Sequence, residues 1–265
     1  MFESMQAPLF FGLIAAFVTT VGLIAVAMRG DWSARFSAVM GLAAAGMLVT
    51  LSLLHIAPEA FAESSRAPYF MLGGFLGGLV LHYGLNTFFP ESAGGGRMAA
   101  VTPIIAIAIH SFIDGVIYSV TFAASFSAGV YAALSLILHE FPEGVIAFAI
   151  LRRHNFSNRQ SFFWAFLAAS ATTPLGVVMS SPFMYFLGPE AVGALFAASA
   201  GLLLYVATGP LMAPLKDEPP VRSLLALTAG VGIALLLSFL PVHGHDDDDH
   251  QHIPMEAPHP LPDEI

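Results

Sequence analysis

Hydrophobic residues in this chain gather into eight long runs separated by short polar stretches. Each run has roughly 20 residues or more, enough to cross the hydrocarbon core of a bilayer as an α-helix. The pattern therefore predicts an all-α, polytopic membrane protein whose transmembrane domain covers residues 1–241. The eight runs are 8–28, 36–62, 68–89, 99–126, 128–150, 161–187, 190–213 and 222–241.

The Lys and Arg residues indicate in which direction the chain crosses the membrane. Eight of the nine lie in loops that follow odd-numbered runs, and Arg66 lies in an even-numbered loop. Because Lys and Arg concentrate in cytoplasmic loops, we expect the odd-numbered loops inside the cell and both termini outside. The fourth run then crosses outward and the fifth crosses inward.

Composition narrows the class of protein further. The chain of 265 residues is 57% hydrophobic and 10% charged, and its mean hydropathy is +0.77, which is typical of an integral membrane protein. It has no basic patch of the kind that nucleic-acid binding requires. It has no cysteine, which excludes disulfides and thiolate metal sites.

The last part of the chain has a different composition. Seven of the eighteen acidic residues follow residue 242 and account for much of the net charge of -9. Histidines at 243, 245, 250 and 252 flank an Asp tract. We expect residues 242–265 to form a disordered exterior tail. Weak metal collection and simple solvation are both open as its role.

Two apolar runs carry a histidine followed four residues later by a carboxylate. These pairs are His110 with Asp114 and His139 with Glu143, and Glu140 follows the second histidine directly. On an α-helix, residues four apart lie on the same face. The fourth and fifth runs are thus expected to direct imidazole and carboxylate groups toward each other near the middle of the membrane.

The second run repeats this spacing with His55 and Glu59. Pro58 and Pro142 fall between the histidine and the acid in the second and fifth runs, and Pro174 and Pro210 lie in the sixth and seventh. Each proline removes one backbone N–H from its helix, so we expect all four runs to be interrupted there. A carbonyl group freed in this way can face a cavity.

The energetic cost of these acids indicates why they are present. A carboxylate at the centre of a membrane helix is unfavourable by roughly 2.5 to 3.5 kcal/mol, so the acids are expected to face the interior of the helix bundle. The Lys and Arg residues lie between the apolar runs or, for Arg222, at the first position of the eighth run, so none is placed to neutralise these acids. Protonation, the neighbouring histidines or a bound cation remain, and histidine together with carboxylate favours a divalent transition metal such as Zn²⁺.

Three motifs together resemble those of the ZIP (Zrt/Irt-like) family of metal-ion transporters. They are His-x-x-Pro-Glu-Ala in the second run, His-Ser-x-x-Asp-Gly in the fourth and His-Glu-x-Pro-Glu-Gly in the fifth, on a chain of eight runs. The resemblance implies import of divalent metals into the cytoplasm, zinc typically and sometimes iron, manganese or cadmium. The metal ligands that it implies are His55, His110, Ser111, Asp114, His139, Glu140 and Glu143.

The resemblance also implies an architecture and a location. The family fold is a three-two-three helix arrangement with inverted outer triplets, in the cell membrane, and homodimers and elevator-like motion are associated with it. Thr173 stands where many members have glutamate, and Gly209-Pro210 stands where others often carry an acid. The ligands of a second, auxiliary metal site are therefore incomplete.

Three functions from different classes fit these residues. In the leading one, a divalent cation passes Glu59 and His55 from outside, binds at the midplane and leaves inward by alternating access. An intramembrane zinc-dependent hydrolase, with Ser111 or a bound water near the metal, is the alternative. A metal-free proton relay or structural ion-pair network is the third. The sequence favours the transporter, which is not an enzyme.

Overall fold

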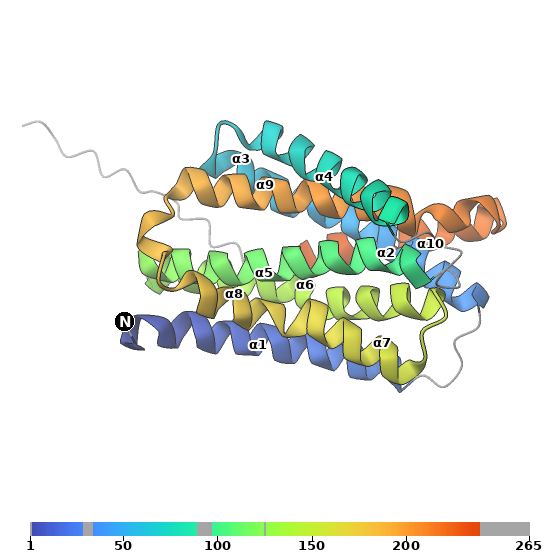
Figure 1. Ribbon diagram of the computed structural model, residues 1–265, viewed down its shortest axis with the longest axis horizontal. Helices are drawn as coiled ribbons and strands as arrows, with labels where there is room; N and C mark the ends of the chain where they lie inside the picture. The colour runs from blue at the N-terminus through green and yellow to red at the C-terminus, as the bar shows by residue number, and fades with distance from the viewer. Residues whose placement is uncertain (1, 29–33, 89–96, 125, 239–265) are drawn as a thin grey trace, which may run out of the picture.

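The computed structural model describes residues 2–28, 34–88, 97–124 and 126–238, and every regular element in those ranges is helical. Consecutive long helices run roughly antiparallel along one axis (Figure 1). The α-helices are α1 (Phe2–Ala27), α2 (Ala34–Leu51), α3 (Ala57–Glu63), α4 (Ala67–Phe88), α5 (Val101–Ala124), α6 (Phe126–Arg153), α7 (Asn158–Ala165), α8 (Thr172–Ser180), α9 (Pro189–Val206) and α10 (Pro220–Ser238).

All eight predicted runs contain helix, and this confirms the fold class. Six helical segments have both the length and the hydropathy of a membrane span: Met5–Ala27, Ala38–Glu63, Val101–Ala124, Ala132–Arg153, Asn158–Ser180 and Pro189–Lys216. The apolar part of α10, Pro220–Leu236, is shorter. Helix α4 has 22 residues and is not among these six segments. The predicted tail lies outside the described residues.

The interruptions predicted at prolines are present in three of the four runs. The second, sixth and seventh runs each contain one turn of π-helix: η1 (Ser52–Ile56), η4 (Phe166–Ser170) and η6 (Ala207–Leu211). Such turns widen the helix locally and re-aim the side chains that follow. The prediction for the fifth run was wrong, because α6 continues through Pro142 without a break. Short 3₁₀ turns lie at Arg97–Ala100, Met184–Phe186 and Ala213–Lys216.

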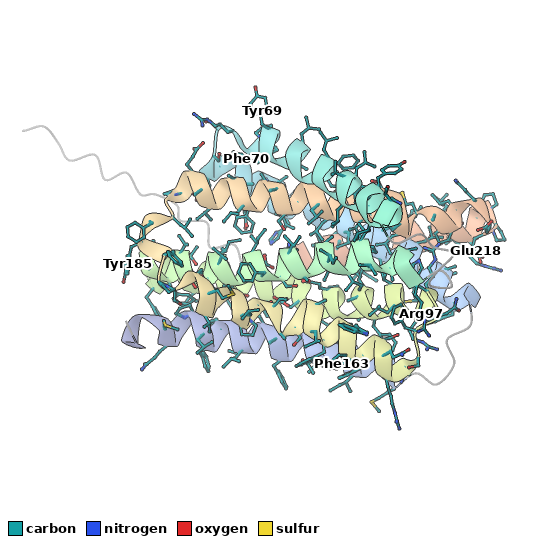
Figure 2. All side chains as sticks on the ribbon, in the orientation of Figure 1. Tyr69, Phe70, Arg97, Phe163, Tyr185 and Glu218 are labelled. Atoms are coloured by element: carbon teal, nitrogen blue, oxygen red, sulfur yellow. The ribbon has the colours of Figure 1, made fainter. Side chains whose placement is uncertain are left out.

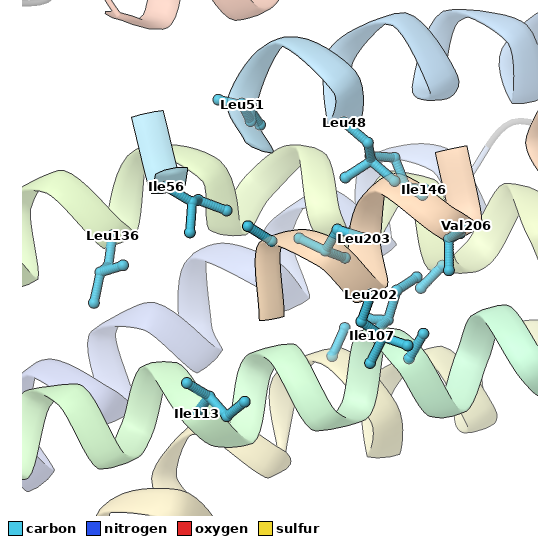
Figure 3. Packing of buried hydrophobic residues seen from close by; sticks show 14 of the residues in the cluster. Leu48, Leu51, Ile56, Ile107, Ile113, Leu136, Ile146, Leu202, Leu203 and Val206 are labelled. Carbon is cyan, nitrogen blue, oxygen red and sulfur yellow. The ribbon is translucent and has the colours of Figure 1, made fainter. Parts of the chain in front are cut away.

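The helices pack into two bundles that do not follow the order of the chain. In the first bundle, α1 lies along α6 and α5 lies along α8; in the second, α2 lies along α10 and α4 along α9. The bundles meet where α5 packs on α9 and α2 packs on α6. Figure 3 shows the aliphatic side chains that fill this interface, among them Leu48, Ile107 and Leu203.

Reciprocal glycine contacts hold the helix pairs within each bundle. In every pair, each helix presents a glycine against a backbone carbonyl of its partner, at a place where a Cβ would collide. Small residues allow membrane helices to approach this closely. The glycines are Gly46 and Gly230 between α2 and α10, Gly74 and Gly201 between α4 and α9, Gly22 and Gly144 between α1 and α6, and Gly115 and Gly176 between α5 and α8.

These contacts also reveal an internal repeat, as the family resemblance implies. Exchanging α1 with α8, α2 with α9, α4 with α10 and α5 with α6 maps each glycine pair onto another. The π-helical turns η1 and η6 obey the same exchange, since each begins six residues after its glycine, Gly46 or Gly201. The first three spans and the last three spans therefore each contribute one span to the first bundle and two spans to the second.

The outer surface carries large apolar and aromatic side chains. Tyr69, Phe70, Phe163 and Tyr185 all point away from the bundles (Figure 2) and are more than 40% exposed. Arg97 and Glu218 lie at the end of the molecule opposite the N-terminus. An apolar surface with charges toward one end suits a protein surrounded by lipid.

Neighbouring glycines of α4 provide a test of the packing. A Cβ at Gly74 would meet the carbonyl of Ala198, whereas one at Gly73 meets nothing within 4 Å. We expect Gly74→Ala to lower the stability of the detergent-solubilised protein by about 1 to 3 kcal/mol, because α4 and α9 must separate. Gly73→Ala is the matched control and should not destabilise. Equal melting temperatures for the two variants would contradict this packing.

Candidate metal site

Helices α5 and α6 bring four potential metal ligands together inside the first bundle. His110 and Asp114 come from α5, and His139 and Glu143 come from α6. One ligand atom from each residue lies within 4.8 Å of all the others. All four residues are buried. The two motifs with four-residue spacing therefore converge, as the sequence predicts.

The distances between ligand atoms are those of a compact site. Nε2 of His139 lies 3.0 Å from Oδ2 of Asp114, and Nε2 of His110 lies 3.5 Å from the same oxygen. Nε2 of His110 is 3.9 Å from Oε2 of Glu143. Zinc bonds of about 2.0–2.1 Å place tetrahedral ligand atoms about 3.4 Å apart, so two nitrogens and two oxygens at these spacings fit a Zn²⁺ ion.

Several polar atoms at this site lack a hydrogen-bond partner within the described part of the chain. They are Oδ1 of Asp114, Nδ1 of His139, Oε1 of Glu140 and Oε2 of Glu143. An unpaired polar atom in a buried site is costly. A divalent cation would balance two carboxylates and engage Oε2 of Glu143, so the donor set suits a metal ion as cargo.

Ser111 and Glu140, two further predicted ligands, lie beside the four-residue cluster and are not members of it. The Ser111 hydroxyl donates to Oε1 of Glu143, which leaves Oε2 directed toward His110. The Glu140 carboxylate is fully buried and accepts a hydrogen bond from the Thr19 hydroxyl of α1. Glu140 follows His139 directly, and adjacent helix residues point about 100° apart.

His55 and Glu59 belong to the second bundle, and the His55 ring lies near His139. The His55 ring is buried, and its centroid is 6.3 Å from that of His139. Glu59, one turn farther along the same span, is half-buried. These residues are thus outside the four-residue cluster and lead from it toward the end of the molecule where α3 lies (Figure 1).

A pocket between the two bundles reaches the same four-residue cluster. His110, His139 and Glu143 line one side of it, and the remaining lining is aliphatic apart from Pro142: Leu48, Leu51, Ile56, Ile107, Ile146 and Leu203. Both bundles contribute side chains to this pocket. The cluster therefore faces a mainly apolar interface between the bundles.

The described Lys and Arg residues lie at helix ends or in connecting turns. Arg152 and Arg153 occupy the last turn of α6, and Arg97 begins a 3₁₀ turn. The metal-ligand cluster lies in the middle of α5 and α6. The buried acids are therefore not neutralised by a nearby cation of the described chain, as the sequence predicts.

Two contacts to this site come from residues that the motifs did not identify. Thr19 of α1 reaches Glu140, and Ser199 of α9 lies with its Oγ 2.6 Å from Nδ1 of His110. Ser199 lies between alanines, and Thr19 lies beside Thr20 within an apolar run. Such hydroxyls carry no spacing signal, since a serine or threonine in a membrane helix usually bonds to its own backbone.

Comparison with known proteins gives the family. The family model described as "ZIP Zinc transporter" matches residues 90–238, which include α5 and α6. The zinc transporter ZupT of Escherichia fergusonii is 26% identical over 229 residues, 82% of this chain and 89% of that protein. The ZupT proteins of Salmonella arizonae and Salmonella newport show the same identity and coverage.

These matches agree with the buried histidine and carboxylate cluster and give no support to the hydrolase alternative. The spans and the family together make the protein an integral protein of the cell membrane. The chain belongs to the ZIP family and is a transporter of divalent metal ions rather than an enzyme.

Proposed function

We propose that this protein imports Zn²⁺ into the cytoplasm by alternating access around the site between α5 and α6. His110, Asp114, His139 and Glu143 would bind the ion, and Ser111 would orient Glu143. The single observation that carries the proposal is the convergence of these four side chains from two helices within 4.8 Å. The related ZupT proteins are named as zinc transporters, which supports zinc as the cargo.

The direction of transport rests on the predicted orientation. With both termini outside, the end of the molecule where α1 begins faces outward (Figure 1). Glu59 and His55 then lie between the outer surface and His139. A cation would pass these two residues first, which agrees with a half-buried Glu59 leading to a buried His55.

Alternating access requires one part of the protein to move against another. The glycine contacts lie within the bundles, between helices that pack backbone to backbone. The interface between the bundles consists mainly of aliphatic side chains (Figure 3). Side-chain surfaces of this kind can slide, whereas interlocked backbones cannot. We therefore propose that the two bundles move as units and expose the buried site alternately to either side.

Transport itself can be measured in liposomes that contain a zinc-sensitive dye. External Zn²⁺ is expected to produce a signal with the wild-type protein, and His110→Ala should abolish it because one of four ligands is removed. Glu218→Gln is the control, since Glu218 pairs with Arg222 on the surface. A wild-type protein that admits no Zn²⁺ would refute the proposed function.

The two acids of the fifth-run motif, Glu140 and Glu143, are expected to contribute unequally to Zn²⁺ binding. Glu143 belongs to the four-residue cluster and Glu140 is turned toward Thr19. Glu143→Gln should therefore weaken Zn²⁺ binding, measured by equilibrium dialysis, by about 100-fold or more, and Glu140→Gln by about tenfold or less. If Glu140→Gln weakened binding as much as Glu143→Gln, the ion would lie closer to Glu140 than we propose.

Metal preference follows from the donor set. Two imidazoles and two carboxylates favour Zn²⁺ over Mn²⁺ and Fe²⁺, and imidazole ligands are poor for Mg²⁺ and Ca²⁺. In the liposome assay we expect Cd²⁺ to compete with Zn²⁺ more strongly than Mn²⁺ does. Excess Mg²⁺ should not compete. Competition by Mg²⁺ at the level of Mn²⁺ would indicate a site built mainly of oxygen ligands.

A further inference from the structure

A hydrogen bond joins the four-residue cluster of the first bundle to the second bundle. Nδ1 of His110 on α5 and Oγ of Ser199 on α9 are 2.6 Å apart. Both side chains are buried. The contact therefore lies inside the protein, at the interface where the bundles meet.

When a metal is bound, the chemistry of imidazole determines which of the two groups donates this hydrogen bond. Nε2 of His110 faces Oδ2 of Asp114 and Oε2 of Glu143, so Nε2 is the nitrogen available to a cation. A neutral imidazole carries one proton. When Nε2 binds a metal, the proton is on Nδ1, and Nδ1 donates it in a hydrogen bond to Ser199. Partners of this kind fix the ring orientation of metal-binding histidines.

The internal repeat shows that the fold does not need a hydroxyl at this place. Ser199 lies two residues before Gly201, and the equivalent residue two before Gly46 is Ala44. Nδ1 of His139, the other histidine of the cluster, has no hydrogen-bond partner within the described residues. The same helix packing thus accepts alanine, and the serine is specific to the His110 side of the site.

Three other buried serines, Ser119, Ser180 and Ser181, contact backbone and no imidazole. Their hydroxyls donate to carbonyls one turn earlier, and that of Ser119 also donates to the carbonyl of Val177, which is ordinary for serine within a helix. The Ser199 hydroxyl contacts an imidazole on another helix. Its role is therefore tied to His110.

We infer that Ser199 is a positioning residue that orients His110 for metal binding. The inference rests on the proposed function, which makes His110 a ligand. Because Ser199 belongs to the second bundle, its hydrogen bond exists only while the bundles are arranged as in this structure. Movement of the first bundle against α9 would break the bond and release the His110 ring, so metal affinity depends on the position of the bundles.

The test compares variants of Ser199 that keep or remove the hydroxyl. Ser199→Ala should raise the Kd for Zn²⁺ of the purified protein, and the KM for transport in liposomes, by about 10-fold to 100-fold. The maximal transport rate at saturating Zn²⁺ should not fall, because all four ligands remain. Ser119→Ala is the control, since it removes an equally buried hydroxyl that bonds away from the site.

Threonine and valine at position 199 separate hydrogen bonding from packing, because they have nearly the same shape and differ in one hydroxyl. Ser199→Thr should bind Zn²⁺ more tightly than Ser199→Val. Equal affinities for these two, or a wild-type KM in Ser199→Ala, would overturn the inference while leaving the proposed function intact. Failure of the wild-type protein to transport Zn²⁺ would instead overturn the proposed function.

Discussion

The structure depends on the need to balance buried negative charge. Asp114, Glu140 and Glu143 lie in the middle of apolar helices, fully or almost fully shielded from solvent. The described Lys and Arg residues lie at helix ends, too far along the helix axes to neutralise them. Burying such acids without a counter-charge is strongly unfavourable. A divalent cation bound at this site would balance the charge, and a site completed by an ion that can also leave it is suited to transport.

The backbone packing of the first bundle also positions the acids of the site. Gly115 and Gly144, each one residue after the acid of its motif, bring α8 and α1 into backbone contact. Thr19, whose carbonyl meets Gly144, also donates to Glu140. The same helix pairs that fix the backbone therefore fix the ligands. The interface with the second bundle consists mainly of aliphatic side chains, which agrees with the proposed movement of the site as one body.

Sequence alone predicted that the motifs of the fourth and fifth runs meet, because each helix encodes its own face, but it also counted His55, Ser111 and Glu140 among the ligands, and these lie outside the four-residue cluster. The four-residue spacing of His110 with Asp114, and of His139 with Glu143, places each pair on one side of its helix whatever surrounds it. The rotation of one helix against another is not encoded locally. The direction of Glu140 toward α1 and the approach of Ser199 from α9 depend on that rotation. The unbroken α6 at Pro142 shows likewise that packing can override a local signal.

The internal repeat gives the site two histidines in related positions but with different surroundings. His110 has Ser199 beside Nδ1, whereas Nδ1 of His139 is unpaired within the described residues and the residue equivalent to Ser199 is Ala44. A symmetric site would hold its ion equally through both helices. Here one imidazole is oriented across the bundle interface and the other is not. The proposed movement of the bundles would therefore change the two halves of the site unequally, because only the His110 side would lose a hydrogen bond to the second bundle.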